Sequence, residues 1–121
     1  MTERITVSSG TEWEQQVGYS RAVRIGDHVW VSGTTGSGTS AAEQTRAALQ
    51  RIIAALADVG AEPSHVVRTR IFVTDIAKWP EIGAEHARVF GTAAPAATMV
   101  EVAALIDPAL VVEIEVDAYL G

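Results

Sequence analysis

Residues 112–120 alternate between apolar and polar side chains more clearly than any other part of the chain. The apolar members are Val112, Ile114, Val116, Ala118 and Leu120, and the others are Glu113, Glu115, Asp117 and Tyr119. A period of two residues is the pattern of a β-strand with one face on a core. We therefore predict a β-sheet, one face of which is covered by other apolar elements of the chain.

Extended segments recur along the chain. In chain order, strands are predicted at residues 4–7, 17–25, 28–33, 65–73, 98–104 and 112–120. Val17 is expected to begin the second of these, and Gly26-Asp27 supplies a tight hairpin turn to the third. Within residues 65–73, Val67 is expected to share one side of the strand with Ile71.

Two helices interrupt the strands. Ser40 and Glu43 have the spacing of a capping box, and Gly60 supplies the left-handed stop of the same helix. Its apolar stripe consists of Leu49, Ile52, Ile53 and Leu56. Pro80 suits the first turn of a second helix, which Gly91 ends.

Two helices of this length cover only one face of a six-stranded sheet. We therefore expect an α+β fold, with one domain over residues 1–121 and two helices packed on one face of a mixed sheet. The other face carries aliphatic side chains. A partly apolar open sheet face favours association with further subunits.

Composition excludes several classes of function. The formal net charge is −6 and no cluster of Lys and Arg is present, so a nucleic-acid partner is not expected. No apolar run is long enough to span a membrane, and residues 1–7 contain no secretory signal. The chain has no cysteine, which excludes thiolate metal sites and fits a cytoplasmic location.

Several motifs in sequence order resemble the RidA/YjgF family. Residues 18–23, Gly-Tyr-Ser-Arg-Ala-Val, resemble its GPYSQAV element, and residues 31–33 resemble the strand end that follows. Residues 66–75 resemble its VVKTTVFVKD strand, and residues 99–115 resemble its C-terminal CVEVARLP…IEIEA block. The resemblance implies a chorismate-mutase-like homotrimer with ligand clefts between subunits. It also implies hydrolysis of imines and enamines of 2-keto acids without a cofactor.

The chain departs from this family at a decisive position. The family arginine falls in a P-A-R-S-C segment, which here reads Pro95-Ala96-Ala97-Thr98-Met99, so Ala97 replaces it. A guanidinium matches both oxygens of a substrate carboxylate, and each hydrogen bond to a charged group is worth about 1.5–3 kcal/mol. We therefore expect inefficient turnover of 2-imino acids and a cleft that favours neutral or amine-bearing ligands. Arg21 and Arg88 are the candidates to replace the missing arginine.

The resemblance also assigns the remaining cleft residues. Glu113 matches the first Glu of the IEIE element and is the expected base, with its pKa raised by partial burial. The expected ligand-binding residues are Tyr19, Ser32, Gly33, Gly83, Ala97, Thr98 and Met99. Gly83 stands where the family often has Asn, and Met99 replaces a small Cys.

Simpler interpretations of these residues stay open. Glu113 is equally consistent with a solvated strand face, and Tyr19 with a half-buried aromatic whose hydroxyl is hydrogen-bonded. The three histidines, His28, His65 and His86, lack metal-ligand spacing, and no His–Asp pair accompanies Ser32. The Gly-rich run 33–38 lacks the lysine of a phosphate-binding loop.

Three functions remain open. The first is a trimer that binds a small metabolite and has lost efficient 2-imino-acid deaminase activity. The second is an imine or enamine deaminase that uses a substitute arginine. The third is a scaffold or regulatory trimer without small-molecule chemistry. A ribonuclease is the weakest reading, because the chain is acidic and has no histidine pair for acid–base cleavage.

Overall fold

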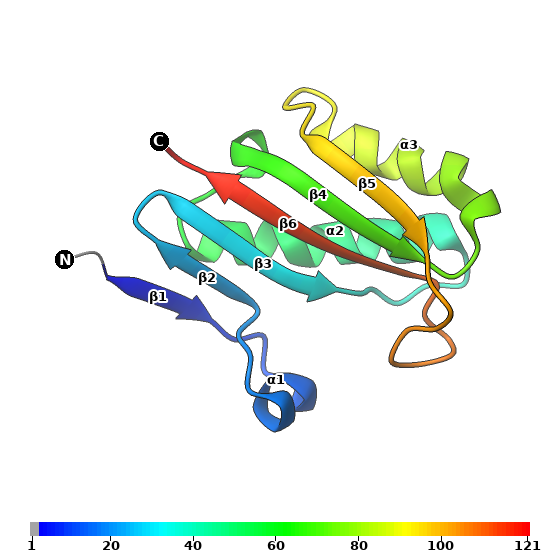
Figure 1. Cartoon of the computed structure of the whole chain (residues 1–121), viewed down its shortest axis with the longest axis horizontal. Coiled ribbons are helices and arrows are strands. Elements are labelled where there is room, and N and C mark those ends of the chain that lie inside the picture. The colour runs from blue at the N-terminus through cyan, green and yellow to red at the C-terminus, as the bar shows by residue number, and fades with distance from the viewer. Residues whose placement is uncertain (1–2) are drawn as a thin grey trace.

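The computed structural model describes residues 3–121. Its central element is a six-stranded mixed β-sheet (Figure 1). The strands are β1 (Arg4–Val7), β2 (Ala22–Ile25), β3 (His28–Thr34), β4 (Val66–Val73), β5 (Ala96–Glu101) and β6 (Val112–Tyr119). Their spatial order is β1-β2-β3-β6-β4-β5. The β4–β5 pair is parallel and the other pairs are antiparallel. The predicted α+β class is confirmed.

Helices α2 (Ala41–Asp58) and α3 (Trp79–Phe90) lie together on one face of this sheet, as predicted (Figure 1). Ser40 caps α2 by accepting a hydrogen bond from the Glu43 backbone, and Gly60 takes a positive φ just after the helix. Two short 3-10 turns, η1 (Pro63–His65) and η2 (Ile76–Lys78), flank β4. No helix within residues 3–121 is long and apolar enough to cross a bilayer.

The core lies between the helices and the inward side of the strands. Its fully buried large side chains include Leu49, Ile52, Leu56, Ile82, Phe90, Ile114 and Val116. Burying each such side chain stabilises the fold by about 1.5–3 kcal/mol. Alternation along β6 puts Glu113 and Glu115 on the opposite face, which no helix covers.

The expectation that residues 17–25 form one extended segment is wrong at its start. Val17 ends a further helix, α1 (Glu12–Val17), and its side chain is exposed. Thr11 caps this helix by accepting from the Glu14 backbone, and Gly18 ends it with a left-handed φ of 87°. These capping signals outweigh the short apolar alternation that suggested a strand.

Two smaller expectations also need correction. The strand expected at 98–104 runs from Ala96 to Glu101 instead. In β4, a register irregularity between Val66 and Arg68 buries Val66 and leaves Val67 half exposed, so Val67 does not share the buried side with Ile71. An irregularity of this kind shifts the alternation of side chains by one residue.

Candidate functional site

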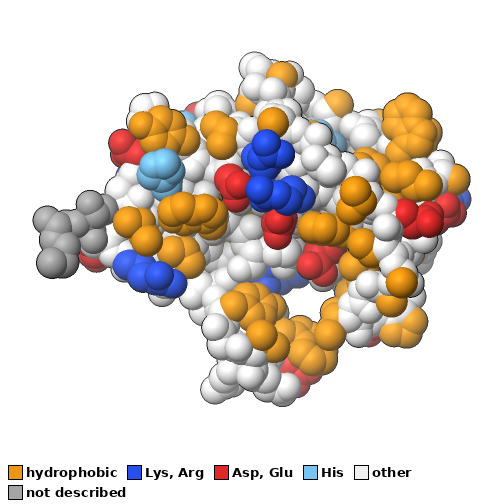
Figure 2. Space-filling model, in the orientation of Figure 1, with side chains coloured by type: hydrophobic (Ala, Val, Ile, Leu, Met, Phe, Trp, Pro, Cys, Tyr) orange, Lys and Arg blue, Asp and Glu red, His pale blue; other side chains and the backbone are white. Residues whose placement is uncertain are grey.

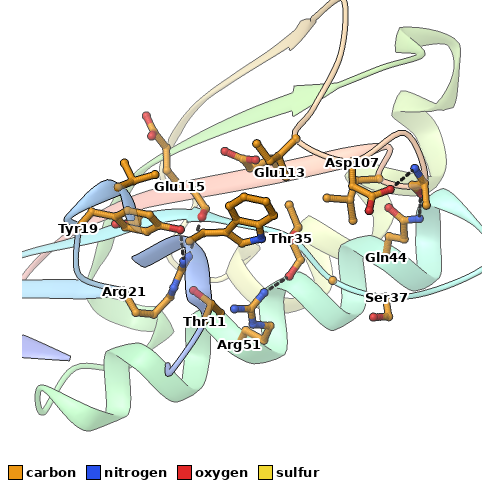
Figure 3. A pocket seen from close by; sticks show the side chains of 18 of the residues that line it. Thr11, Tyr19, Arg21, Thr35, Ser37, Gln44, Arg51, Asp107, Glu113 and Glu115 are labelled. Carbon is orange, nitrogen blue, oxygen red and sulfur yellow. Dashed lines mark hydrogen bonds between the residues drawn. The ribbon is translucent and has the colours of Figure 1, made fainter. Parts of the chain in front are cut away.

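A pocket of about 770 Å³ opens where α1, the end of β3, α2 and the loop between β5 and β6 approach β6. Figure 2 shows a hollow in this part of the uncovered sheet face, with hydrophobic side chains along its rim. The charged residues that line the pocket are Arg21, Arg51, Asp107, Glu113 and Glu115. In Figure 3 the two guanidinium groups lie on one side of it, and the carboxylates of Glu113 and Glu115 lie on the other.

Glu113 projects from β6 into this pocket. Burial raises the pKa of its carboxyl, the charge of Arg21 opposes this rise, and Glu115 adds to it. This direction agrees with the expectation from the sequence. No cation within residues 3–121 forms an ion pair with Glu113. Its carboxylate packs against Gly33, where an added Cβ atom would overlap it and would displace the end of this flexible side chain.

Arg21 forms the polar floor of the pocket and is almost completely buried, with 4% of its surface exposed. Its Nη1 donates to the Gly33 carbonyl at 2.7 Å and to Thr34 Oγ1 at 2.8 Å. Its Nη2 donates to the Tyr19 hydroxyl at 3.3 Å (Figure 3). The Nε atom is buried without a hydrogen-bond partner among the described residues. The guanidinium therefore joins the segment before β2 to the end of β3.

Glu14 of α1 balances the charge of Arg21. Its Oε2 lies 3.7 Å from Arg21 Nη2, and both side chains are buried. Burial alone would raise the pKa of this carboxyl, but hydrogen bonds from Ser9 and Thr11 lower it to about 2. The Ser9 backbone donates at 3.0 Å and the Thr11 hydroxyl at 2.7 Å, and the Ser9 hydroxyl donates as well.

Four of the residues expected in the cleft come together in this pocket: Tyr19, Ser32, Gly33 and Glu113. The Ser32 hydroxyl donates to the Ser20 carbonyl at 2.6 Å, which secures the connection between β3 and the segment before β2. The Tyr19 hydroxyl accepts from Arg21, and the Tyr19 ring lies 5.5 Å from the guanidinium carbon.

The other expected residues lie outside this pocket within one chain. Ala97 and Thr98 are exposed on β5, the edge strand farthest from β1, and Met99 packs against the border of the core. Gly83 lies on α3 beside the Trp79 ring. Strands β4 and β6 separate β5 from β3, so one chain does not bring the two sets together.

The two candidate replacement arginines have different surroundings. Arg21 lines the pocket, but most of its donors already bind groups of the chain. Arg88 is not among the lining residues, and its side chain is 70% exposed near Glu85. The expected preference for neutral or amine-bearing ligands rested on Ala97 in place of the family arginine. The pocket in Figure 3 contains two other guanidinium groups, those of Arg21 and Arg51.

Other residues that line the pocket were not predicted from the sequence, among them Trp13, Thr35, Gln44, Arg51 and Ile106. Trp13 was missed because α1 was not predicted. Residues 3–121 contain no group of three His, Asp or Glu side chains arranged to hold a metal ion.

Comparison with known proteins places the chain in a family. The family model described as Endoribonuclease L-PSP matches residues 10–120. A crystal structure of Rv2704 from Mycobacterium tuberculosis, a member of the YjgF/YER057c/UK114 family, is 60% identical. It superposes with a TM-score of 0.96 over 98% of this chain and 100% of that one.

Curated relatives agree with this assignment. The uncharacterized protein SCO2049 of Streptomyces coelicolor is 35% identical over 95% of this chain and 91% of its own length. A RutC family protein of Sinorhizobium fredii is 30% identical over 85% of this chain and 86% of its own length. The chain belongs to the Endoribonuclease L-PSP family, the RidA/YjgF group that its motifs resemble.

The Glu14 network predicts a dependence of stability on pH. The pKa of Glu14 is about 2 in the folded chain and 4.5 ordinarily. Its contribution is therefore complete above about pH 4.5 and is lost as the pH falls toward 2. Glu14 is buried, but its hydrogen-bond donors Ser9 and Thr11 are exposed and partly exposed, so solvent screening limits the contribution of the network to about 1–2 kcal/mol.

Glu14→Gln should lower the free energy of unfolding by about this amount at neutral pH, and the loss should shrink below about pH 4. Urea unfolding of the wild type and of Glu14→Gln at several pH values measures this difference in the free energy of unfolding. Glu12→Gln, an exposed change on the same helix, is the control. A loss that is the same at every pH would show that the Glu14 charge does not stabilise the fold.

Proposed function

We propose that the chain binds a small metabolite in the pocket around Glu113 and hydrolyses 2-imino acids inefficiently. The observation that carries this proposal is a half-buried carboxylate on the wall of a pocket of about 770 Å³, without an ion-pair partner among residues 3–121. A carboxylate of raised pKa can accept a proton or hold a water molecule. The family arginine that would grip a substrate carboxylate is replaced by Ala97.

We further propose that the functional unit is a homotrimer whose subunits share the clefts. The uncovered sheet face supports this, because Trp30, Val100 and Tyr119 are exposed on β3, β5 and β6. Figure 2 shows hydrophobic side chains among charged ones on this face. Packing of this face against a second copy would bring β5 of one subunit toward the pocket of the next. In such an arrangement Ala97, Thr98 and Met99 would complete a cleft around Glu113.

A second candidate is imine deamination with a substitute arginine. The position of Arg21 on the pocket floor favours this alternative. The surroundings of Arg21 oppose this alternative, because Nη1 and Nη2 already donate to Gly33, Thr34 and Tyr19 and the remaining Nε donor is buried, which hinders a bidentate grip on a ligand carboxylate.

Restoring the family arginine tests the proposed loss of activity. The wild type should barely accelerate the decay of 2-iminobutanoate above the uncatalysed rate. Ala97→Arg should increase the rate at least about tenfold, because it supplies charge-assisted hydrogen bonds to the carboxylate. Ala97→Gln, which is long but uncharged, is the control. Robust activity of the wild type would contradict this proposal and support the deaminase with a substitute arginine.

Sedimentation equilibrium, which measures the mass of the protein in solution, tests whether the chain forms a homotrimer. The wild type should have three times the mass of one chain. Trp30→Glu, on the uncovered sheet face, should reduce the mass to that of a monomer, because it places a charge in an apolar contact. Trp79→Glu changes another exposed tryptophan, at the start of α3, and should leave the trimer intact. A monomeric wild type would contradict the shared clefts.

A further inference from the structure

Besides Glu113, a second charged residue without an ion-pair partner among residues 3–121, Arg51, lines the pocket. It projects from α2, is partly exposed, and donates from Nη1 to the Thr35 carbonyl at 2.7 Å (Figure 3). No carboxylate lies within 4.0 Å of its guanidinium nitrogens among residues 3–121. No other hydrogen bond of the Arg51 guanidinium occurs in this part of the chain. Its remaining N–H groups therefore have no protein acceptor.

The surroundings of Arg51 are cationic. Burial lowers its pKa, the nearby charge of Arg21 lowers it further, and Glu14 and Tyr19 act in the opposite direction. Glu14 is already engaged with Arg21, Ser9 and Thr11. Two guanidinium groups thus share one end of a pocket with a single committed carboxylate. An anion that enters this end would relieve their repulsion.

The acidic lining residues do not fill this role. Glu115 lies 3.3 Å from Arg70 on the uncovered sheet face. Asp107 accepts a hydrogen bond from the Ala109 backbone at 2.8 Å within the loop between β5 and β6. Glu113 faces Arg21 and Glu115. The pocket is therefore dipolar, with an unpaired guanidinium at the Arg51 end and an unpaired carboxylate at the Glu113 end.

Exposed apolar side chains also line this pocket. Trp13 and Val17 project from α1 with exposed fractions of 43% and 72%, and Ile106 projects from the opposite loop with 66%. Trp13 and Val17 are four residues apart, so they lie on the same side of α1. A ligand with a hydrocarbon or aromatic body would cover this apolar surface.

We propose that Arg51 is the anion-binding residue of this pocket, and that the ligand is a small carboxylate with an apolar body. This inference rests on the proposed binding function and names its ligand class. A planar guanidinium with free donors matches a carboxylate. A doubly charged phosphate would meet stronger repulsion from the acidic wall around Glu113 and Glu115. The anion anchor is then on α2 of the same chain, whereas the family arginine belongs to the β5 segment.

Three probes of similar size and different charge test this inference: phenylacetate, phenylacetamide and 2-phenylethylammonium. Isothermal titration calorimetry of the wild type should give the tightest binding for phenylacetate. Arg51→Gln should weaken phenylacetate binding about tenfold or more, because it removes a charge-assisted hydrogen bond. The same substitution should leave the affinity for phenylacetamide within about twofold of the wild-type value. Arg51→Lys keeps the charge but lacks the planar guanidinium. Its affinity for phenylacetate should lie between the affinities of the wild type and Arg51→Gln.

Arg4→Gln is the matched control, since it removes one positive charge from an exposed position on β1 outside the pocket. It should leave phenylacetate binding unchanged. Equal phenylacetate binding by the wild type and Arg51→Gln would overturn the role of Arg51. If phenylacetamide or 2-phenylethylammonium bound and phenylacetate did not, the binding function would stand and the carboxylate class would fall. If none of the three probes bound, both proposals would fall.

Discussion

The candidate site depends on the buried guanidinium of Arg21. It binds the Gly33 carbonyl and the Thr34 hydroxyl at the end of β3, the Tyr19 hydroxyl before β2, and the Glu14 carboxylate of α1. A buried charge of this kind is tolerated only when it is paired and hydrogen-bonded. The position of α1 beside the sheet, and hence one wall of the pocket, follows from this requirement.

This arrangement leaves Glu113 without a cation of its own. Arg21 is close enough to influence the pKa of Glu113, but its donors are directed to Gly33, Thr34 and Tyr19. Gly33 lets the carboxylate approach the β3 backbone because it lacks a Cβ atom. In the described part of the chain, Glu113 on the sheet and Arg51 on α2 thus line one pocket without ion-pair partners. Such a pair suits a ligand that supplies both missing partners.

Much of the fold was readable from local patterns, because alternation and capping are local properties. The strict alternation of 112–120 predicted β6, and Ser40 with Gly60 predicted α2. Helix α1 was missed because its six residues carry too weak a periodicity against the Val17–Ile25 alternation. The family motifs predicted Tyr19, Ser32, Gly33 and Glu113 as site residues, and these four residues line one pocket. Arg51 could not be found in this way, since its role depends on tertiary contacts with a loop and with Arg21.

The proposed function depends on Glu113 being a partly desolvated carboxylate without a cationic partner among residues 3–121. An NMR titration of its carboxyl carbon in the wild type, assigned through Glu113→Gln, tests this claim most directly. We predict a midpoint above the ordinary glutamate value, since burial raises the pKa of Glu113 more than Arg21 lowers it. A midpoint at or below that value would show that a cation pairs with Glu113, and would contradict the account.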